Sequence, residues 1–332
     1  MTRLVRLLLA CALAALALGV AAASAQQPQG RITGVVLLGG SEPLTEPLTV
    51  QLIVLGQSGV QAAQETVTEA GRFAFDVEPD ADLSYVARTV YDGVQYLAPP
   101  VLLAPELPTA EVELVVYETT TEPPALTVDR TTVTVLRLDR ANAQIVFLRE
   151  DDVLNPGDRV FIGGEDGVTL RIPLPDGTVV AEAGGEGDSR VEGGTLAVAT
   201  GLRPGVTTVV SRYVVGYDQA RDAYALRVTA PLPTEHMEVS VPTRFADAIR
   251  PLAGSIDAGT RDEAGELSTV VAHDGAAGPG ESVSVLLDGL AGRNAPNPLT
   301  GTGGATIAVV LALAVIAGGA AALHLAGRRG AA

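Results

Sequence analysis

The chain has 332 residues, with 39 acidic against 22 basic side chains, and its formal net charge is −17 at pH 7. Because binding to nucleic acid or anionic lipid headgroups depends on cationic contacts, this charge argues against both as partners. All basic residues are arginine, and the lack of lysine excludes Schiff-base chemistry and cross-links between lysine and asparagine.

The first 25 residues have the three parts of a secretory signal peptide. Arg3 and Arg6 form a basic start, residues 7–20 are apolar, and residues 23–25 (Ala-Ser-Ala) are the small residues that precede a cleavage site. We expect cleavage after residue 25. Cleavage removes Cys11, the single cysteine, so the exported chain has neither disulfides nor thiolate ligands and depends on ordinary burial for stability.

Residues 30–119 alternate between apolar and polar residues in short runs separated by Gly, Pro or Asp, which is typical of a β-sandwich. Phe73 and Phe75 are two residues apart and are expected on one buried face. Glu69-Ala70-Gly71 predicts a hairpin, with Gly71 at positive φ. The expected strands are 32–38, 48–55, 65–68, 72–77, 84–90, 101–103 and 112–117.

Several motifs in this region resemble the carboxypeptidase regulatory-like domain, a transthyretin-like (prealbumin-like) sandwich. The family's G-x-V matches Gly34-Val35-Val36, its second strand matches Val50-Gln51-Leu52, and its T-x-T-x-x-G-x-F-x-F segment matches residues 66–75. Its last strands correspond to Tyr85-Val86, Tyr91-Asp92-Gly93 and Val112-Glu113-Leu114. The connection at residues 39–47 departs from the family's usual D-x-x-G-x-P.

The resemblance implies a non-catalytic companion domain, not a peptidase. The zinc-binding H-x-x-E motif of the peptidases is missing, since the third residue after His236 is Val239. The order of segments is similar to that of exported bacterial proteins that carry this domain first, further β structure next and one membrane helix last.

Glu122-Pro123-Pro124 predicts a domain boundary, because two prolines remove two ladder donors. Residues 122–291 again predict β-strands, as one Greek-key sandwich or two small ones; we favour one, with the strands after Pro231 as an annex. Pro173 and Pro175 indicate that the strand 168–174 lies at an edge or ends there. Residues 182–194 and 257–280 are expected to be mobile surface loops. The expected strands are 126–128, 132–138, 143–149, 168–174, 196–199, 207–215, 223–229, 237–241 and 282–287.

Residues that could carry chemistry are sparse. His236 and His273 lack a second histidine or cysteine at ligand spacing, and residues 56–59 (Gly-Gln-Ser-Gly) miss the G-x-S-x-G spacing of a hydrolase. The acidic groups at 80–82 and 257–266 do not follow the EF-hand pattern. We therefore expect no enzyme, no metal site and no cofactor.

Residues 305–326 predict a transmembrane helix. They are apolar except for His324, and at 1.5 Å per residue they cover the roughly 30 Å hydrocarbon core of a bilayer. Arg328 and Arg329, in the tail 327–332, mark the cytoplasmic side. We expect a single-pass type I protein of the plasma membrane, with most of the chain outside the cytoplasm.

Asn297, Pro298, Leu299, Thr300 and Gly301 resemble the cell-wall sorting signal read by sortases, L-P-x-T-G, with asparagine in place of its leucine. Its use would attach Thr300 to the wall and discard the helix. The alternative, which we favour, is that residues 292–304 are only a linker between the domains and the bilayer.

These patterns predict an all-β protein with tandem sandwiches and one C-terminal transmembrane helix. We expect it to be non-catalytic and to bind an envelope protein or polysaccharide, or to support an envelope complex. The alternative is an accessory subunit of a membrane enzyme or transport complex, because Gly318, Gly319 and Ala322 permit close helix contacts.

Overall fold

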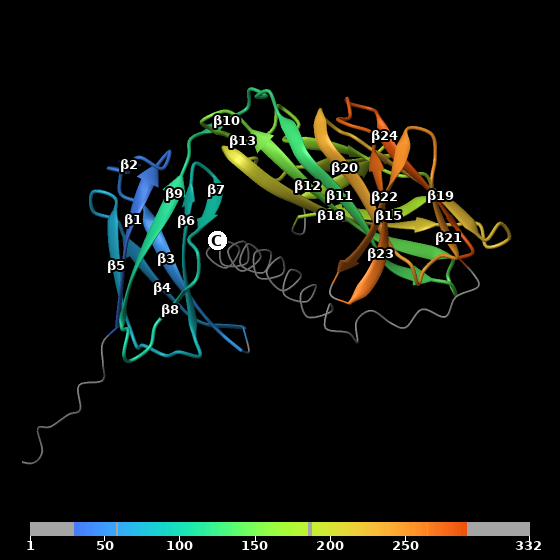
Figure 1. The fold of residues 1–332 in the computed structure, drawn as a ribbon. Coiled ribbons are helices and arrows are strands. Elements are labelled where there is room, and N and C mark those ends of the chain that lie inside the picture. Colours follow the sequence, from blue (N-terminus) through green and yellow to red (C-terminus); the bar gives the residue numbers. More distant parts are fainter. Residues whose placement is uncertain (1–29, 58, 185–187, 264, 291–332) are drawn as a thin grey trace, which may run out of the picture. The chain divides into compact units, whose positions relative to one another are not determined.

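The computed structural model describes residues 30–57, 59–184, 188–263 and 265–290. All regular secondary structure in this part is β-strand, which confirms the all-β prediction, and the chain divides into two compact units between Glu118 and Thr119 (Figure 1). No helix of the described residues is long and apolar enough to cross a membrane. The predicted signal peptide, linker, transmembrane helix 305–326 and tail lie outside these residues.

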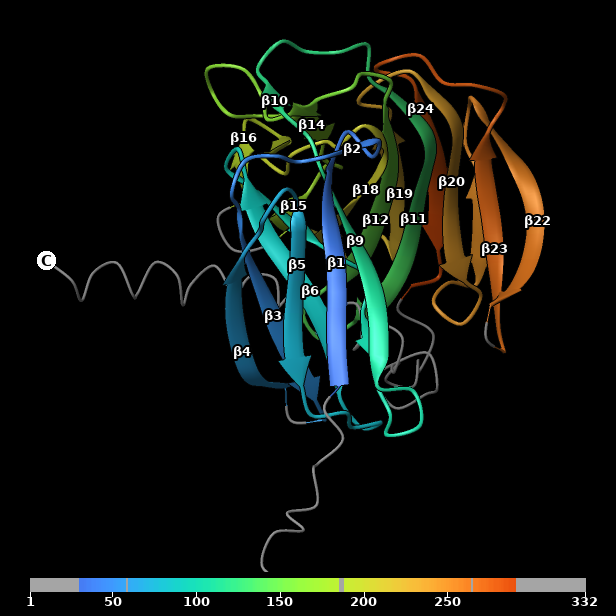
Figure 2. The same cartoon turned by 90° about the vertical axis from the view of Figure 1, so that its left-hand side faces the viewer.

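The first unit is a sandwich of two sheets (Figure 2). In one sheet, β1 (Gly30–Leu38) lies between antiparallel β5 (Arg72–Val77) and parallel β9 (Thr109–Val116), and β2 (Glu42–Pro43) pairs with the end of β1. The other sheet has the order β4 (Gly59–Val67), β3 (Thr49–Gly56), β6 (Ser84–Tyr91), β7 (Val94–Leu97), and β8 (Val101–Leu102) also pairs with β6.

The core of this unit follows the alternation in the sequence. Phe73 and Phe75 are both buried, with ring centroids 5.9 Å apart in an edge-to-face arrangement, so the prediction of a shared core face is confirmed. Leu52 and Leu114, from the two different sheets, are also buried. Within these strands, side chains two residues apart share the buried face.

The predicted hairpin turn at residues 69–71 forms, with Glu69 and Arg72 exchanging backbone hydrogen bonds of 3.0 Å, but the strands on either side of it do not pair with each other. Gly71 has φ 77°, as expected, but β4 and β5 belong to different sheets, and the turn carries the chain from one to the other. The Val36 N–H donates a hydrogen bond of 2.7 Å to the carbonyl of Gly71, which draws β5 to β1. A Cβ at Gly71 would lie 2.9 Å from the Leu44 carbonyl oxygen, so only glycine fits this approach.

The second unit is built on one seven-stranded sheet. Only the β11–β20 pair in it is parallel. The order is β15 (Thr178–Ala183), β18 (Gly205–Gly216), β12 (Gln144–Asn155), β11 (Thr127–Asp139), β20 (Thr234–Pro242), β23 (Glu266–His273), β22 (Ser255–Glu263).

Two three-stranded sheets cover one face of this large sheet. The first has the order β14 (Leu170–Pro173), β17 (Thr195–Val198), β16 (Ser189–Glu192), and the second β19 (Ala223–Thr229), β24 (Ser282–Asp288), β21 (Ala248–Pro251). A further short pair joins β10 (Thr119–Thr120) to β13 (Val160–Phe161). Strand β14 lies at an edge, as Pro173 predicts, because an edge position does not need every ladder donor.

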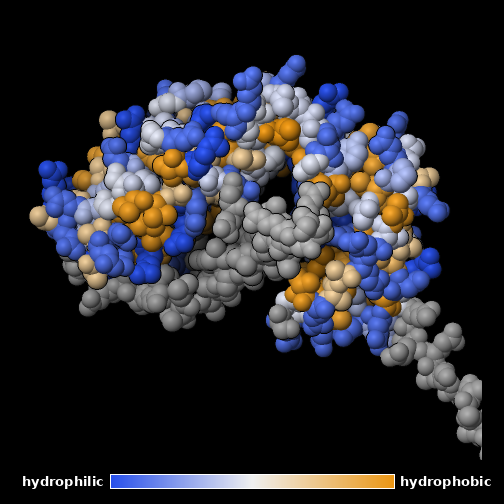
Figure 3. Space-filling view, turned by 180° about the vertical axis from the view of Figure 1, so that it is seen from behind, coloured by the Kyte–Doolittle hydropathy of each residue, from blue (hydrophilic) through white to orange (hydrophobic). Residues whose placement is uncertain are grey.

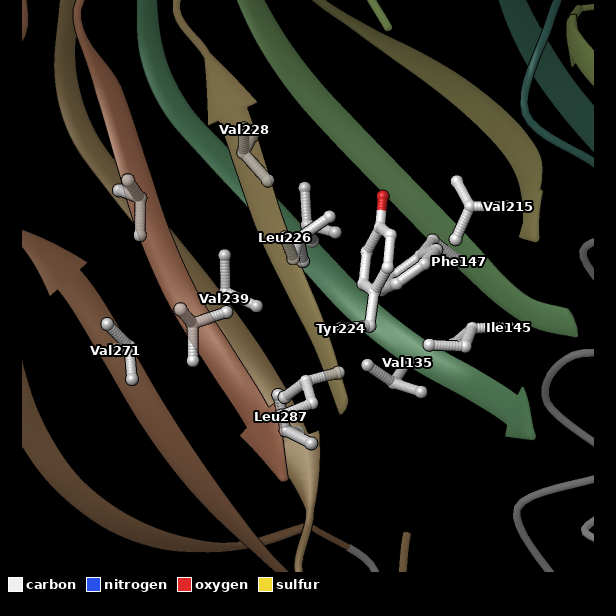
Figure 4. Packing of buried hydrophobic residues seen from close by; sticks show 14 of the residues in the cluster. Val135, Ile145, Phe147, Val215, Tyr224, Leu226, Val228, Val239, Val271 and Leu287 are labelled. Atoms are coloured by element: carbon white, nitrogen blue, oxygen red, sulfur yellow. The ribbon is translucent and has the colours of Figure 1, made fainter. Parts of the chain in front are cut away.

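Each small sheet forms its own apolar cluster against the large one. The cluster under β19 and β24 contains Phe147 and Leu226, with Tyr224 beside Phe147 (Figure 4). It also contains Tyr213, whose ring stacks on that of Phe147 with centroids 5.2 Å apart. The cluster under β14 and β17 contains Val153 and Ile172. The strands after Pro231 are not an annex, because β20 pairs directly with β11 and buries its apolar face in the first cluster.

Strand β11 corrects the prediction of two strands at 126–128 and 132–138. It is one continuous strand in which the register shifts between Val128 and Arg130 and again between Val135 and Arg137. Each β-bulge adds one residue and reverses which side chains face inward, so Val128, Val133 and Leu138 are all buried. The broken alternation reflects these bulges, not a gap between strands.

Most of the predicted loop at 257–280 is β structure. It contains most of β22 and all of β23, and β23 is held against β20 with Val271 in the apolar cluster. Likewise, the predicted loop at 182–194 contains the end of β15 and all of β16. Glycine and acidic residues made both stretches resemble loops, but edge strands tolerate such residues because one side of each faces solvent.

Candidate functional site

A polar cluster lies in the core of the second unit, between the two apolar clusters. Arg149 and Asp151 are two residues apart on β12, so both point to the buried face, and their side chains are 1% and 0% exposed. Arg149 Nε donates to Asp151 Oδ2 at 2.7 Å, and Nη2 donates to Oδ1 at 2.9 Å. This two-point geometry is the strong form of the arginine–carboxylate contact.

Two neighbouring segments complete the cluster. The hydroxyl of Thr131 on β11 donates to Asp151 Oδ1 at 2.7 Å, and Arg149 Nη2 also donates to the carbonyl oxygen of Thr229 at 3.2 Å. Thr229 ends β19, so the arginine links the large sheet to one of the small sheets that cover it. The cluster therefore fixes how the layers of this unit sit on each other.

Electrostatics keep Arg149 charged despite its burial. Burial lowers the pKa of Arg149, but attraction to the Asp151 carboxylate and the hydrogen bonds to it outweigh that effect and raise the pKa overall. Burial also raises the pKa of the nearby Tyr213 phenol well above its ordinary value. A charged pair sealed from solvent has no access to substrate, so its role is structural.

Two hydroxyl groups beside the pair have no hydrogen-bond partner among the described residues. They are Ser211 Oγ, directly across the strand pair from Arg149, and the phenol oxygen of Tyr213. A buried hydroxyl without a partner loses its hydration and gains nothing in return. These groups are consequently poor contributors to stability, in contrast to Asp151.

The opposite face of the large sheet carries accessible ionisable groups. Glu150 and Asp152 point away from the core, since their neighbours Arg149 and Asp151 point into it. Thr132 is the cross-strand neighbour of both Glu150 and Glu238, which places hydroxyl and carboxylate groups on three adjacent strands, β12, β11 and β20. We call Thr132, Glu150, Asp152, Thr208 and Glu238 the outer polar face.

Specific contacts order this face. The hydroxyl of Thr208 donates to Asp152 Oδ1 at 2.7 Å, and Arg261 donates to both oxygens of Glu238, at 2.9 and 3.2 Å. The pKa of Glu150 is raised, first by partial burial and second by the negative charge of Asp152. Figure 3 shows the mixed character of one side of the molecule, where hydrophilic residues surround smaller apolar patches.

The raised pKa of Glu150 predicts a pH-dependent gain in stability from Glu150→Gln. The folded state holds this proton more tightly than the unfolded chain, so ionised Glu150 weakens the fold at neutral pH. The substitution is expected to raise the free energy of unfolding at pH 7 by well under about 1 kcal/mol, since the charge is screened by solvent, and so to raise the urea midpoint slightly. The gain should fade as the pH drops through the raised pKa, and an equal gain at pH 7 and pH 4 would contradict the assignment.

The predicted histidine candidates do not form a site together. His236 shares β20 with buried Met237, its immediate neighbour, so His236 points to the opposite, exposed face. His273 is the last residue of β23 and follows the inward-pointing Val271 by two positions, so it lies on the same face of the strand. Its Nδ1 lies 3.1 Å from the Gly275 carbonyl oxygen. The two rings thus belong to opposite faces of the sheet.

The acidic residues considered as metal ligands accept hydrogen bonds from backbone N–H groups close by in the chain. Asp257 Oδ1 accepts a hydrogen bond from the Gly259 N–H and Asp262 Oδ1 from the Gly265 N–H, both at 2.8 Å, while Asp80 Oδ1 accepts from the Asp82 N–H at 2.9 Å. In the described part of the chain, no three His, Cys, Asp or Glu side chains are placed to hold a metal ion. Ser58 and the sorting-like residues 297–301 lie outside the described residues.

Sequence reasoning missed the Arg149–Asp151 pair. The predicted strand ended at Arg149, because charged residues in a strand normally face solvent. The local pattern gave no clear signal, because residues 145–148 form a continuous apolar run and Leu154 follows Val153, so both faces of the strand carry apolar residues. Without a period of two, the sequence does not indicate which face the charged residues join.

No protein-family model matches this chain, and no curated protein matches it. The carboxypeptidase regulatory-like assignment therefore stays a prediction. Among solved structures, an M1 zinc metallopeptidase from Deinococcus radiodurans is 12% identical with a TM-score of 0.30, over 49% of this chain and 42% of that one. The chain thus spans less than half of the metallopeptidase's length.

Two pilins also show similarity to the chain. The major pilin SpaD from Corynebacterium diphtheriae is 14% identical, with a TM-score of 0.20, over 81% of this chain and 85% of that one. The pilus protein RrgB from Streptococcus pneumoniae is 9% identical, with a TM-score of 0.21, over 82% and 63%. Scores this low carry no argument about function.

Proposed function

We propose that this protein is a non-catalytic component of a bacterial cell envelope, which displays two rigid β-sandwich units outside the membrane and binds an envelope protein or polysaccharide. The outer polar face carries this proposal. Its carboxylates and hydroxyls stand in cross-strand register on a sheet whose other face is fixed by the Arg149–Asp151 cluster. Such a pre-ordered array suits several hydrogen bonds to a sugar chain or to a basic protein surface.

The division between buried and exposed polar groups supports a binding role over a catalytic one. One close set of ionisable and hydroxyl groups, Arg149, Asp151 and Thr131, is sealed in the core. His236 and His273 lie on opposite faces of the sheet, so they cannot act together in one catalytic site. Anchoring through residues 305–326 is part of the proposal and rests on the sequence pattern alone.

Binding can be tested with the full chain in mild detergent, incubated with envelope fractions from its own cells before and after protein removal or wall-polysaccharide digestion. We expect retention that depends on one of the two components. Glu150→Lys with Glu238→Lys should weaken it at least tenfold. A matched control, Glu192→Lys on the separate small sheet, should bind as the wild type does. Equal binding by both variants, or turnover of envelope material by the wild type, contradicts the proposal.

Anchoring has its own test, the intact mass of the protein extracted from its native envelope with and without wall digestion. A mass that begins at Gln26 and ends at Ala332 supports signal cleavage and a retained helix. Release only after wall digestion, with the chain ending at Thr300, shows use of residues 297–301 as a sorting signal. Co-purification of a stoichiometric membrane complex points instead to the accessory-subunit alternative.

A further inference from the structure

Strand β4 (Gly59–Val67) is an open sheet edge along its whole length. It pairs with β3 on one side, and no described strand pairs with its other side (Figure 2). Its side chains are exposed except at Gly59 and Thr66, which are half-buried, and Val60 and Val67 are 59% and 58% exposed. A strand bonded on one side and covered on neither face gains little from burial, so it is a natural place for another strand to add.

One hydrogen bond shows which backbone N–H and C=O groups of β4 point away from β3. The Thr68 N–H donates to the Leu48 carbonyl at 2.9 Å, toward the strand that becomes β3. Backbone groups along an antiparallel strand alternate in direction, so those of Val67, Glu65 and Ala63 point away from β3. These three residues present the free edge.

Comparison with β22, one of the two edge strands of the large sheet, shows what β4 lacks. Strand β22 carries Asp257, Arg261 and Asp262 and has a bulge between Asp257 and Gly259, with Gly259 at φ 92°. Charges and bulges of this kind prevent edge-to-edge pairing. In β4 the bulge lies at Gln61, near the turn, and residues 62–67 run regularly with a single charge and no proline.

That single charge, Glu65, is turned back across the sheet. Its carboxylate accepts a hydrogen bond from the side-chain amide of Gln51 on β3, and the amide oxygen of Gln51 accepts one from Arg88 Nε on β6, at 2.6 Å. Arg88 thus lies at the other end of a chain of contacts that holds the carboxylate against the face of the sheet. Glu65 consequently does not oppose the addition of another strand as the charged side chains of β22 do.

We propose that β4 pairs with β4 of a second copy of this chain, antiparallel, about a two-fold axis at Gln64. An axis at Glu65 would set two carboxylates directly opposite each other, which is destabilising. An axis at Gln64 places Gln64 opposite Gln64 of the second copy and Ala63 opposite Glu65 of the second copy. The outward backbone groups of Ala63 and Glu65 in both chains then bond to each other, and the two sheets become one.

The charge of the protein sets the salt dependence of this pairing. Two copies of a chain with net charge −17 repel each other, and added salt screens that repulsion. Dimerisation is therefore expected to tighten between about 0.01 and 0.15 M salt. A contact held by ion pairs would weaken over the same range.

Disulfide trapping tests both the pairing and its register, because Cys11 is the only cysteine of the chain and is replaced by serine throughout. Single cysteines are placed at positions 62, 63, 64 and 66 of the full-length protein in mild detergent, with Thr260→Cys on β22 as the matched control. Directly opposed residues have Cβ atoms about 4.5–5.5 Å apart, close to disulfide distance, whereas diagonal neighbours are about 7–8 Å apart. Gln64→Cys should therefore cross-link fastest, at least tenfold faster than Thr260→Cys.

Sedimentation of the cysteine-free protein gives an independent readout. Ala63→Pro removes an N–H that points away from β3, so it should keep the monomer folded and abolish the dimer. The proposal is overturned by a flat cross-linking profile equal to that of Thr260→Cys, or by a protein that stays monomeric at all concentrations and salt levels. Neither outcome bears on the outer polar face, which lies in the other unit.

Discussion

Asp151→Ala is expected to destabilise the second unit by about 3–5 kcal/mol, the cost typical of leaving one partner of a buried ion pair uncompensated. The substitution removes the two carboxylate oxygens that accept from the Arg149 guanidinium, one of which also accepts from the Thr131 hydroxyl. The arginine, still sealed from water, keeps only the Thr229 carbonyl oxygen as acceptor within the part of the chain that the structure describes. Urea unfolding at pH 7, followed by circular dichroism, measures the loss. We expect a transition at clearly lower urea concentration for this unit.

Two further variants separate the ion pair from simple loss of packing. Ser211→Ala removes a fully buried hydroxyl that has no partner among the described residues, so it is expected to be neutral or slightly stabilising. Arg149→Met combined with Asp151→Leu removes both charges and fills the space, and should recover most of the stability lost in Asp151→Ala. A loss in Ser211→Ala as large as that in Asp151→Ala would refute this account.

Gly34→Ala is expected to destabilise the first unit by about 3 kcal/mol or more, through overpacking without room to relax. A Cβ at Gly34 would lie 2.2 Å from Phe73 Cζ and 2.7 Å from the Val112 carbonyl oxygen. Strand β1 is hydrogen-bonded to β5 and β9 on its two sides, so neither neighbour can move away cheaply. Limited proteolysis with mass spectrometry would report early cleavage within residues 30–118.

The control for this prediction is Gly164→Ala, since a Cβ there meets no atom within 4 Å and Gly164 is not among the glycines with positive φ. It should match the wild type. Phe73→Leu in the Gly34→Ala background removes the ring but leaves the clash with the Val112 carbonyl, so only part of the stability should return. A wild-type proteolysis pattern for Gly34→Ala would show that the sheet relaxes around the new methyl group.

Local alternation was sufficient to predict many strands and their buried faces. The expected strands 72–77 and 223–229 coincide with β5 and β19, and Phe73 and Phe75 share the core as predicted. The two-residue period of a strand is a property of the backbone, so it can be read without knowing what the strand packs against. The same holds for the edge position that Pro173 predicts for β14.

The arrangement of the strands in sheets could not be predicted in this way. The turn at residues 69–71 has the sequence of a hairpin, yet it connects two sheets, because β5 pairs with β1 and not with its predecessor. Strand β11 reads as two strands because its bulges reverse the alternation. Pairing partners are set by burial between segments far apart in the chain, which no local pattern records.

The candidate sites divide along the same line. By itself the sequence determined the charge, the lack of lysine chemistry and the alternating strands. It also predicted the segments 1–25, 297–301 and 305–326, and these predictions stay untested by the described residues. Only the tertiary structure decided that Arg149 and Asp151 face inward, because their acceptance in the core depends on Thr131 and Thr229 from other strands. A buried charge is stable only where distant segments supply its partners, and that supply is a property of the fold.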